Sequence, residues 1–150
     1  MNDASLPDIR HEMTMAVPLA RAWRVMTEPA YVARWLGCLN YKKKIGHVFF
    51  MQPDEKRRAG GNVEGATHCE ILALDEPELL KFSWFLPGYP KTEVEFRLRD
   101  AGPSRTQVTF VHTGWAQFNA KDIRQIWEQL SGGWISFVMP GLKGVAESAE

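Results

Sequence analysis

The longest amphipathic pattern in the chain lies in its last segment, residues 119–148. Apolar residues recur there at steps of three and four, the spacing that places side chains on one face of an α-helix. These residues are Ile123, Ile126, Trp127, Leu130, Trp134, Phe137, Val138, Gly141 and Val145. Because the stripe contains two tryptophans and a phenylalanine, we predict one long helix that packs against a broad, concave partner.

The partner is predicted by a different pattern, in which apolar and polar residues alternate and so occupy opposite faces of a strand. Strands are expected at 9–17, 45–52, 63–74, 79–86, 92–98 and 105–113. Two short amphipathic helices interrupt this series, one after Pro18 and one after Pro29, and Gly37 is placed to end the second.

The order of these elements predicts the architecture. Most strands follow one another through short turns, which indicates an antiparallel sheet, and there is no alternation of strands and helices that would indicate a parallel one. We therefore expect an α+β fold in which a curved antiparallel sheet wraps around the long C-terminal helix. Residues 1–150 form one domain, of which residues 1–8 are expected to be frayed.

Composition excludes several classes of function. The 150 residues contain 18 Lys plus Arg and 18 Asp plus Glu, so the net charge is zero, which argues against a nucleic-acid partner. No apolar run reaches the roughly 20 residues of a membrane span, and the N-terminus has no signal-peptide pattern. Cys38 and Cys69 are too few for a disulfide scaffold, so we expect free thiols and a cytoplasmic location.

The last helix contains residues that weaken a helix. Gly132 and Gly133 each lower helix stability by roughly 1 kcal/mol relative to alanine, and we expect them to allow a close approach to the sheet. Pro140 cannot donate a hydrogen bond to the Ser136 carbonyl, so a kink is expected.

A hollow between helix and sheet is where we expect a function. Large aromatic residues either fill such a space or line a cavity within it, and the sequence leaves both alternatives open. The candidate ligand-binding residues are Trp35, Trp84, Phe96, Phe110, His112, Trp127, Trp134 and Phe137. His112 shares a strand face with Val108 and Phe110, so it is either a core histidine or a polar anchor for a ligand. The four histidines form no metal-binding motif, and we predict no metal and no cofactor.

Several local strings also resemble a known superfamily. Val17-Pro18 through Ala22-Trp23 resembles its "P-x-x-V-W" helix start, and Thr27-Glu28-Pro29 with Trp35 its "T-D-P…W" helix. Residues 80–84 resemble "L-V-F-T-W", residues 106–115 resemble "T-x-V-T-L-x-H-x-G", and Gly133-Trp134 with Leu142-Lys143 resembles "G-W…L-K". The superfamily is the helix-grip (START-like, SRPBCC) fold of lipid-transfer domains, the birch-pollen allergens and polyketide cyclases. The greatest likeness is to its Hsp90-ATPase-activator-homologue-like family.

The resemblance and the aromatic stripe together favour binding of a small, mostly hydrophobic or aromatic molecule. Two alternatives stay open. One is a polyketide-cyclase-like or hydrolase-like enzyme that uses His112. The other is an interaction module, with an Hsp90-type chaperone or a second copy of the chain as its partner.

Overall fold

In the computed structural model of the protein, residues 6–52, 54–118 and 120–148 are described, and they contain one seven-stranded antiparallel sheet. The strands are β1 (Ile9–Met15), β2 (Cys38–Leu39), β3 (Val48–Met51), β4 (Thr67–Asp75), β5 (Leu79–Trp84), β6 (Thr92–Gly102) and β7 (Arg105–Thr113). Their spatial order is β1-β7-β6-β5-β4-β3-β2, so the first strand pairs with the last. This topology confirms the predicted α+β helix-grip architecture.

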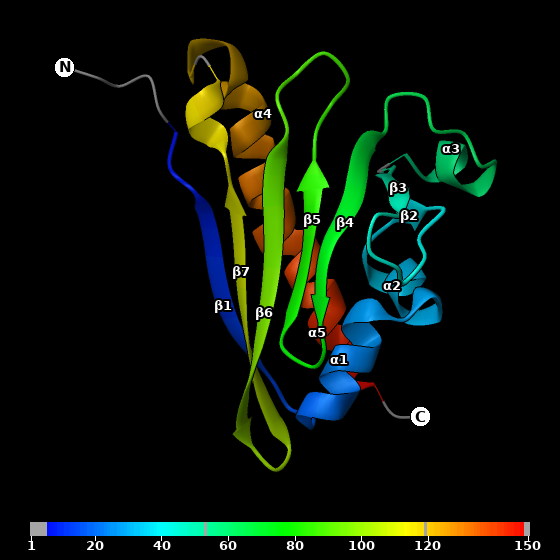
Figure 1. Ribbon diagram of the computed structural model, residues 1–150, viewed down its shortest axis with the longest axis vertical. Coiled ribbons are helices and arrows are strands. Elements are labelled where there is room, and N and C mark those ends of the chain that lie inside the picture. The colour runs from blue at the N-terminus through cyan, green and yellow to red at the C-terminus, as the bar shows by residue number, and fades with distance from the viewer. Residues whose placement is uncertain (1–5, 53, 119, 149–150) are drawn as a thin grey trace.

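The helices are distributed along one face and the margins of this sheet (Figure 1). They are α1 (Leu19–Thr27), α2 (Pro29–Trp35), α3 (Glu55–Ala59), η1 (Trp115–Gln117), α4 (Ala120–Gly133), η2 (Trp134–Val138) and α5 (Met139–Glu147). The last two α-helices and η2 run consecutively and cross the sheet diagonally, whereas α1 and α2 lie near the α5 end.

Strand β2 and helix α3 were not expected from the sequence. Strand β2 is only two residues long, and helix α3 lies in the charged segment 53–61, which ends in Gly60-Gly61 and is expected from its composition to be a turn. Asp54 explains the helix, because its side chain accepts a hydrogen bond from the Arg57 N–H (3.0 Å) and so caps the first turn. Asn119, which the sequence suggests as the N-cap of the last helix, lies outside the described residues.

The core lies between the sheet and the C-terminal helix. Alternation in β6 buries Val94, Phe96 and Leu98, whose neighbours on the other face are more exposed. Phe96 is contacted from two sides, by Trp134 (ring centroids 6.3 Å apart) and by Trp35 (5.6 Å). Aromatic packing therefore fixes both α2 and η2 against the middle of the sheet.

The N-terminal segment contributes to this packing. Leu6 is buried, and the Pro7 carbonyl accepts a hydrogen bond from Trp127 Nε1 (2.9 Å). Residues 6 and 7 are thus held against the core and α4, in contrast to the fraying expected there, and residues 1–5 lie outside the described residues.

The C-terminal helix has a widened turn where the sequence predicts a kink. Residues 134–138 form a π-helix, in which the Met139 N–H donates to the Trp134 carbonyl five residues back. Pro140 lies directly beyond, where no N–H is available for the usual bond. The π turn lets the helix continue through Pro140, and such turns are frequent at functional sites.

Candidate functional site

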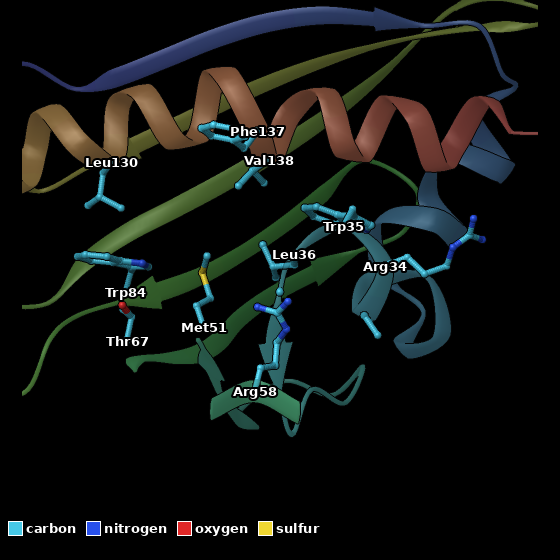
Figure 2. A pocket seen from close by; sticks show the side chains of 12 residues that line it. Arg34, Trp35, Leu36, Met51, Arg58, Thr67, Trp84, Leu130, Phe137 and Val138 are labelled. Atoms are coloured by element: carbon cyan, nitrogen blue, oxygen red, sulfur yellow. The ribbon is translucent and has the colours of Figure 1, made fainter. Parts of the chain in front are cut away.

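Two adjoining pockets lie between the C-terminal helix and the sheet, with volumes of about 370 Å³ and 700 Å³. They share six lining residues, Met51, Thr67, Trp84, Leu130, Phe137 and Val138. Figure 2 shows Leu130 and Val138 pointing down from the helix toward Trp84 and Met51 on the other side. We call the two pockets together the groove, and we distinguish them as the smaller and the larger pocket.

The floor of the groove is formed where three strands end. Met51 ends β3 and pairs with Thr67, which begins β4, while Trp84 ends β5. The isolated bridge between His68 and Phe85 holds β4 beside the end of β5. Antiparallel pairing therefore brings together three residues that are well separated in the sequence.

The roof of the groove depends on the π turn. On a regular helix, Trp134 and Phe137 would share a face, because they are three residues apart. The wider turn increases the angle between them, so that Trp134 is buried and Phe137 is 76% exposed at the rim. Both residues still line the larger pocket, Trp134 from inside and Phe137 from the edge.

The two glycines of this helix serve a different purpose from the expected one. A Cβ added at Gly132 or Gly133 would meet no atom within 4 Å, so neither glycine permits a close approach to the sheet. Gly133 instead lines the larger pocket. The expected tight contact is wrong, because the space opposite Gly133 is part of the groove.

His112 is enclosed in the core, and both of its ring nitrogens have partners. Trp134 Nε1, which can only donate, lies 3.2 Å from Nδ1, and Thr92 Oγ1 lies 2.7 Å from Nε2. Nδ1 must therefore accept, and Nε2 carries the proton and donates to Thr92, whose hydroxyl donates to the Trp84 carbonyl (2.7 Å). Burial lowers the pKa of His112 to about 3, so the ring is neutral at pH 7.

Trp84 lies next to this network and faces the groove. Its ring packs edge-on against His112 (centroids 5.2 Å apart), and it lines both pockets. Its Nε1–H is buried and has no hydrogen-bond partner among the described residues. A buried donor without a partner costs about 1–3 kcal/mol.

Charged residues are distributed unevenly between the two pockets. Arg34 and Arg58 line the smaller pocket, whereas Glu55 lines only the larger one. Arg58 Nη1 donates to the Gln52 carbonyl (2.7 Å), which directs the side chain from α3 toward Leu36 (Figure 2). The Cys38 thiol stays protonated, because burial raises its pKa to about 12 despite the nearby Arg58.

The structure places half of the predicted ligand-binding residues at the groove. Trp35 lines the smaller pocket, Trp134 the larger, and Trp84 and Phe137 line both. Phe96, Phe110 and His112 are buried and line neither pocket. Trp127 also lies outside the lining, and its half-buried indole donates to the Pro7 carbonyl instead.

Several lining residues were not among the predicted ones. Leu130 and Val138 belong to the apolar stripe of the last helix, so a signal for them was present. Met51 and Thr67 carry no such signal, because only strand pairing brings them to the groove. Arg58 belongs to the basic run Lys56-Arg57-Arg58, which the sequence alone indicates to be a solvated turn, whereas its guanidinium turns inward.

The described residues contain no group of three or more His, Cys, Asp or Glu side chains that could hold a metal ion. Within the same part of the chain, none of the helices combines the length and the apolar character needed to cross a membrane.

Comparison with solved structures gives the fold a wider context. MLL2253 from Mesorhizobium loti is 22% identical, with a TM-score of 0.77 over 96% of this chain and 99% of that one. CalU16 from Micromonospora echinospora is 21% identical, with a TM-score of 0.71 over 93% of this chain and 74% of that one. An HSP90 activator from Plasmodium falciparum is 13% identical, with a TM-score of 0.72 over 92% of this chain and 94% of that one.

At these identities the likeness establishes a shared fold. No curated protein sequence matches the chain. The family model described as "Activator of Hsp90 ATPase homolog 1-like protein" matches residues 16–133, and the chain belongs to this family.

Proposed function

We propose that the protein binds a small, mostly apolar molecule in the groove between the sheet and the C-terminal helix. The observation that carries this proposal is the groove itself, whose two pockets have volumes of about 370 Å³ and 700 Å³. Small-molecule sites typically measure about 300–1,000 Å³ and have mainly apolar walls with a few polar groups. The groove has this character.

The lining residues suit an apolar ligand of variable shape. Leu130, Val138 and Phe137 provide an aliphatic and aromatic roof, and Met51 provides a flexible side chain that adapts to different outlines. Trp84 provides a flat surface in the floor. Of the predicted residues, Trp35, Trp84, Trp134 and Phe137 would contact the ligand directly, while Phe96, Phe110 and His112 would support them.

A thermal-shift screen with fatty acids and aromatic metabolites tests the proposal. A ligand at 100 times its dissociation constant stabilises the folded state by about 2.7 kcal/mol. For a chain of this size, 1 kcal/mol corresponds to a rise in Tm of about 2–4 °C, so we expect a rise of several degrees for a binder. If no compound of either class raises Tm, the proposal is contradicted.

A second candidate is a protein-interaction role with an Hsp90-type chaperone. It is supported by the family to which the chain belongs and by the fold shared with the Plasmodium falciparum HSP90 activator. The test is the ATPase rate of a purified Hsp90 with and without this protein. An increase that saturates with protein concentration supports this role, and an unchanged rate argues against it.

The enzymatic alternative built on His112 gains no support from the geometry. Both ring nitrogens are hydrogen-bonded, and the ring lines neither pocket. A general acid or base needs a nitrogen within reach of the substrate.

A further inference from the structure

Arg58 presents hydrogen-bond donors to the smaller pocket that have no acceptor among the described residues. Its guanidinium has five N–H groups, of which one donates to the Gln52 carbonyl. No salt bridge involves Arg58 within the described part of the chain. A molecule in the groove that carries an acceptor can therefore pair with Arg58 as well as cover apolar surface.

We infer that the ligand is an apolar carboxylic acid, whose carboxylate is held by Arg58 in the smaller pocket and whose apolar body extends into the larger pocket. This inference rests on the proposed function and deepens it, because it names the chemical class of the ligand.

The position of Arg58 separates it from an ordinary surface arginine. Its side chain is half-buried, and in Figure 2 its guanidinium reaches from α3 into the pocket beneath Leu36. Gly37 leaves room for it, since a Cβ at this position would lie 3.3 Å from Arg58 Nη1. Gly37 also has a positive φ of 67°, which disfavours a larger residue. The guanidinium is thus held in place before any ligand arrives.

The charges around the groove determine which end of the ligand lies in which pocket. The smaller pocket is lined by Arg34 and Arg58 and by no acidic residue, while Glu55 lines the larger pocket. In Figure 2, the Arg34 side chain points away from Arg58, so the carboxylate is assigned to Arg58 alone. The nearby Cys38 thiol does not neutralise Arg58, because burial keeps it protonated. An anion is therefore attracted to the smaller pocket and repelled from the Glu55 end.

A carboxylate fits this position better than other anions or neutral groups. Guanidinium is planar and permanently charged, and it pairs with planar carboxylates through two parallel hydrogen bonds. One Arg58 nitrogen already donates to Gln52, and the remaining N–H groups are available for such a pair. The apolar lining of the larger pocket then matches an aliphatic or aromatic body.

The test compares acids with alcohols that have the same body. Octanoate is paired with octan-1-ol, and 4-phenylbutyrate with 4-phenylbutan-1-ol, and affinities are measured by calorimetry at pH 7.5. We expect each acid to bind the wild type about tenfold more tightly than its alcohol, the size of one hydrogen bond to a charged group. Arg58→Met, which keeps much of the apolar stem, should reduce this preference to about twofold or less.

Arg57→Met is the matched control. It removes the same charge from the same helix, but Arg57 bonds to the Glu64 carbonyl and lines neither pocket. This variant should keep the preference for acids. Arg58→Lys preserves the charge while removing the planar fork, so it should weaken the acids severalfold and leave the alcohols unchanged. If Arg58→Met does not fold, Arg58→Lys is the variant whose affinities for acids and alcohols are compared with those of the wild type.

The outcomes separate this inference from the proposed function. Equal binding of acids and alcohols by the wild type would overturn the inference and leave an apolar binding site. A preference for acids that survives in both Arg58 variants would also overturn it, because the carboxylate would then be held elsewhere. Absence of binding by every member of both pairs would contradict the inference and count against the proposed function as well.

Discussion

His112 has a fixed protonation state because each ring nitrogen faces a group whose role is determined. Trp134 Nε1 can only donate to Nδ1, so a protonated imidazole would place two N–H groups against each other. The network then continues through Thr92 to the Trp84 carbonyl, joining the C-terminal helix to β7, β6 and β5. At the scale of single residues, His112 therefore has a structural role: it connects the C-terminal helix to the strands that support the groove.

This arrangement predicts a pH-dependent stability. The pKa of His112 falls from 6.5 to about 3 on burial, so below pH 6.5 the unfolded chain takes up a proton that the folded chain does not. The contribution of His112 to the free energy of unfolding is complete above pH 6.5 and is lost as the pH falls toward 3. Between pH 7 and pH 5 the free energy of unfolding should fall by about 2 kcal/mol.

The measurement is urea unfolding of the wild type and of His112→Gln at both pH values. Glutamine supplies a neutral acceptor and donor without a titrating ring. The free energy of unfolding of the variant should therefore fall by about 2 kcal/mol less than that of the wild type over the same interval. An equal fall in both proteins would show that His112 is not the group responsible.

At the scale of elements, the π turn and Gly133 together shape the roof of the groove. The turn directs Trp134 into the core and Phe137 to the rim, and the missing side chain at Gly133 leaves the space between them open. Gly133 has ordinary helical angles (φ −64°, ψ −46°), so backbone geometry does not require glycine there. The absence of a side chain at this position is explained by the groove.

Gly133→Leu should therefore close the larger pocket without unfolding the protein. Replacing a helical glycine improves helix propensity by about 0.5–1 kcal/mol, and the new Cβ meets no atom within 4 Å. We expect unchanged or higher Tm together with at least a tenfold loss of affinity for 4-phenylbutan-1-ol, because a branched side chain occupies the ligand's space.

Gly132→Leu is the control for this substitution. Gly132 is exposed, lies in the same helix and lines neither pocket, so the variant should gain similar stability and retain binding. Loss of binding in both variants would indicate an effect on the helix as a whole. Full binding by Gly133→Leu would place the ligand outside the larger pocket.

At the scale of the whole molecule, the general architecture could be predicted because it depends on repeated patterns. Alternation along residues such as Val94, Phe96 and Leu98 fixes which face of a strand is buried, and the stripe of the last helix supplies what covers that face. A single irregular residue changes such a pattern little. The predicted antiparallel sheet around a long helix is accordingly what the structure shows.

The groove was less predictable, because it depends on pairing and direction. Met51 and Thr67 meet only through the register of β3 and β4. Arg58 turns inward because Asp54 begins a short helix in a segment expected to be a turn. The position of the irregularity at Pro140 could be predicted from its missing N–H, whereas the π turn that precedes it could not.

The two parts of the C-terminal helix have different surroundings. Its α5 end is hydrogen-bonded to the first strand and the first helix of the fold. The Ala16 N–H donates to Glu147 Oε2 (2.7 Å), and Lys143 Nζ donates to the Thr14 carbonyl (3.0 Å). Arg21 Nε donates to the Ala146 carbonyl (2.8 Å). By contrast, residues 126–138 supply the roof of the groove and border open space on that side.

Ligand binding should consequently protect one part of this helix and leave the other unchanged. Backbone amides exchange through local opening, and a ligand at 100 times its dissociation constant slows exchange about 100-fold where opening requires its release. We expect hydrogen exchange in 4-phenylbutyrate to slow within residues 126–138 and to stay unchanged within 142–147. Gly133→Leu, whose groove is filled, should show no slowing. Equal protection of both segments would mean that the helix opens as one unit, and protection confined to residues 142–147 would place the ligand at the α5 end instead.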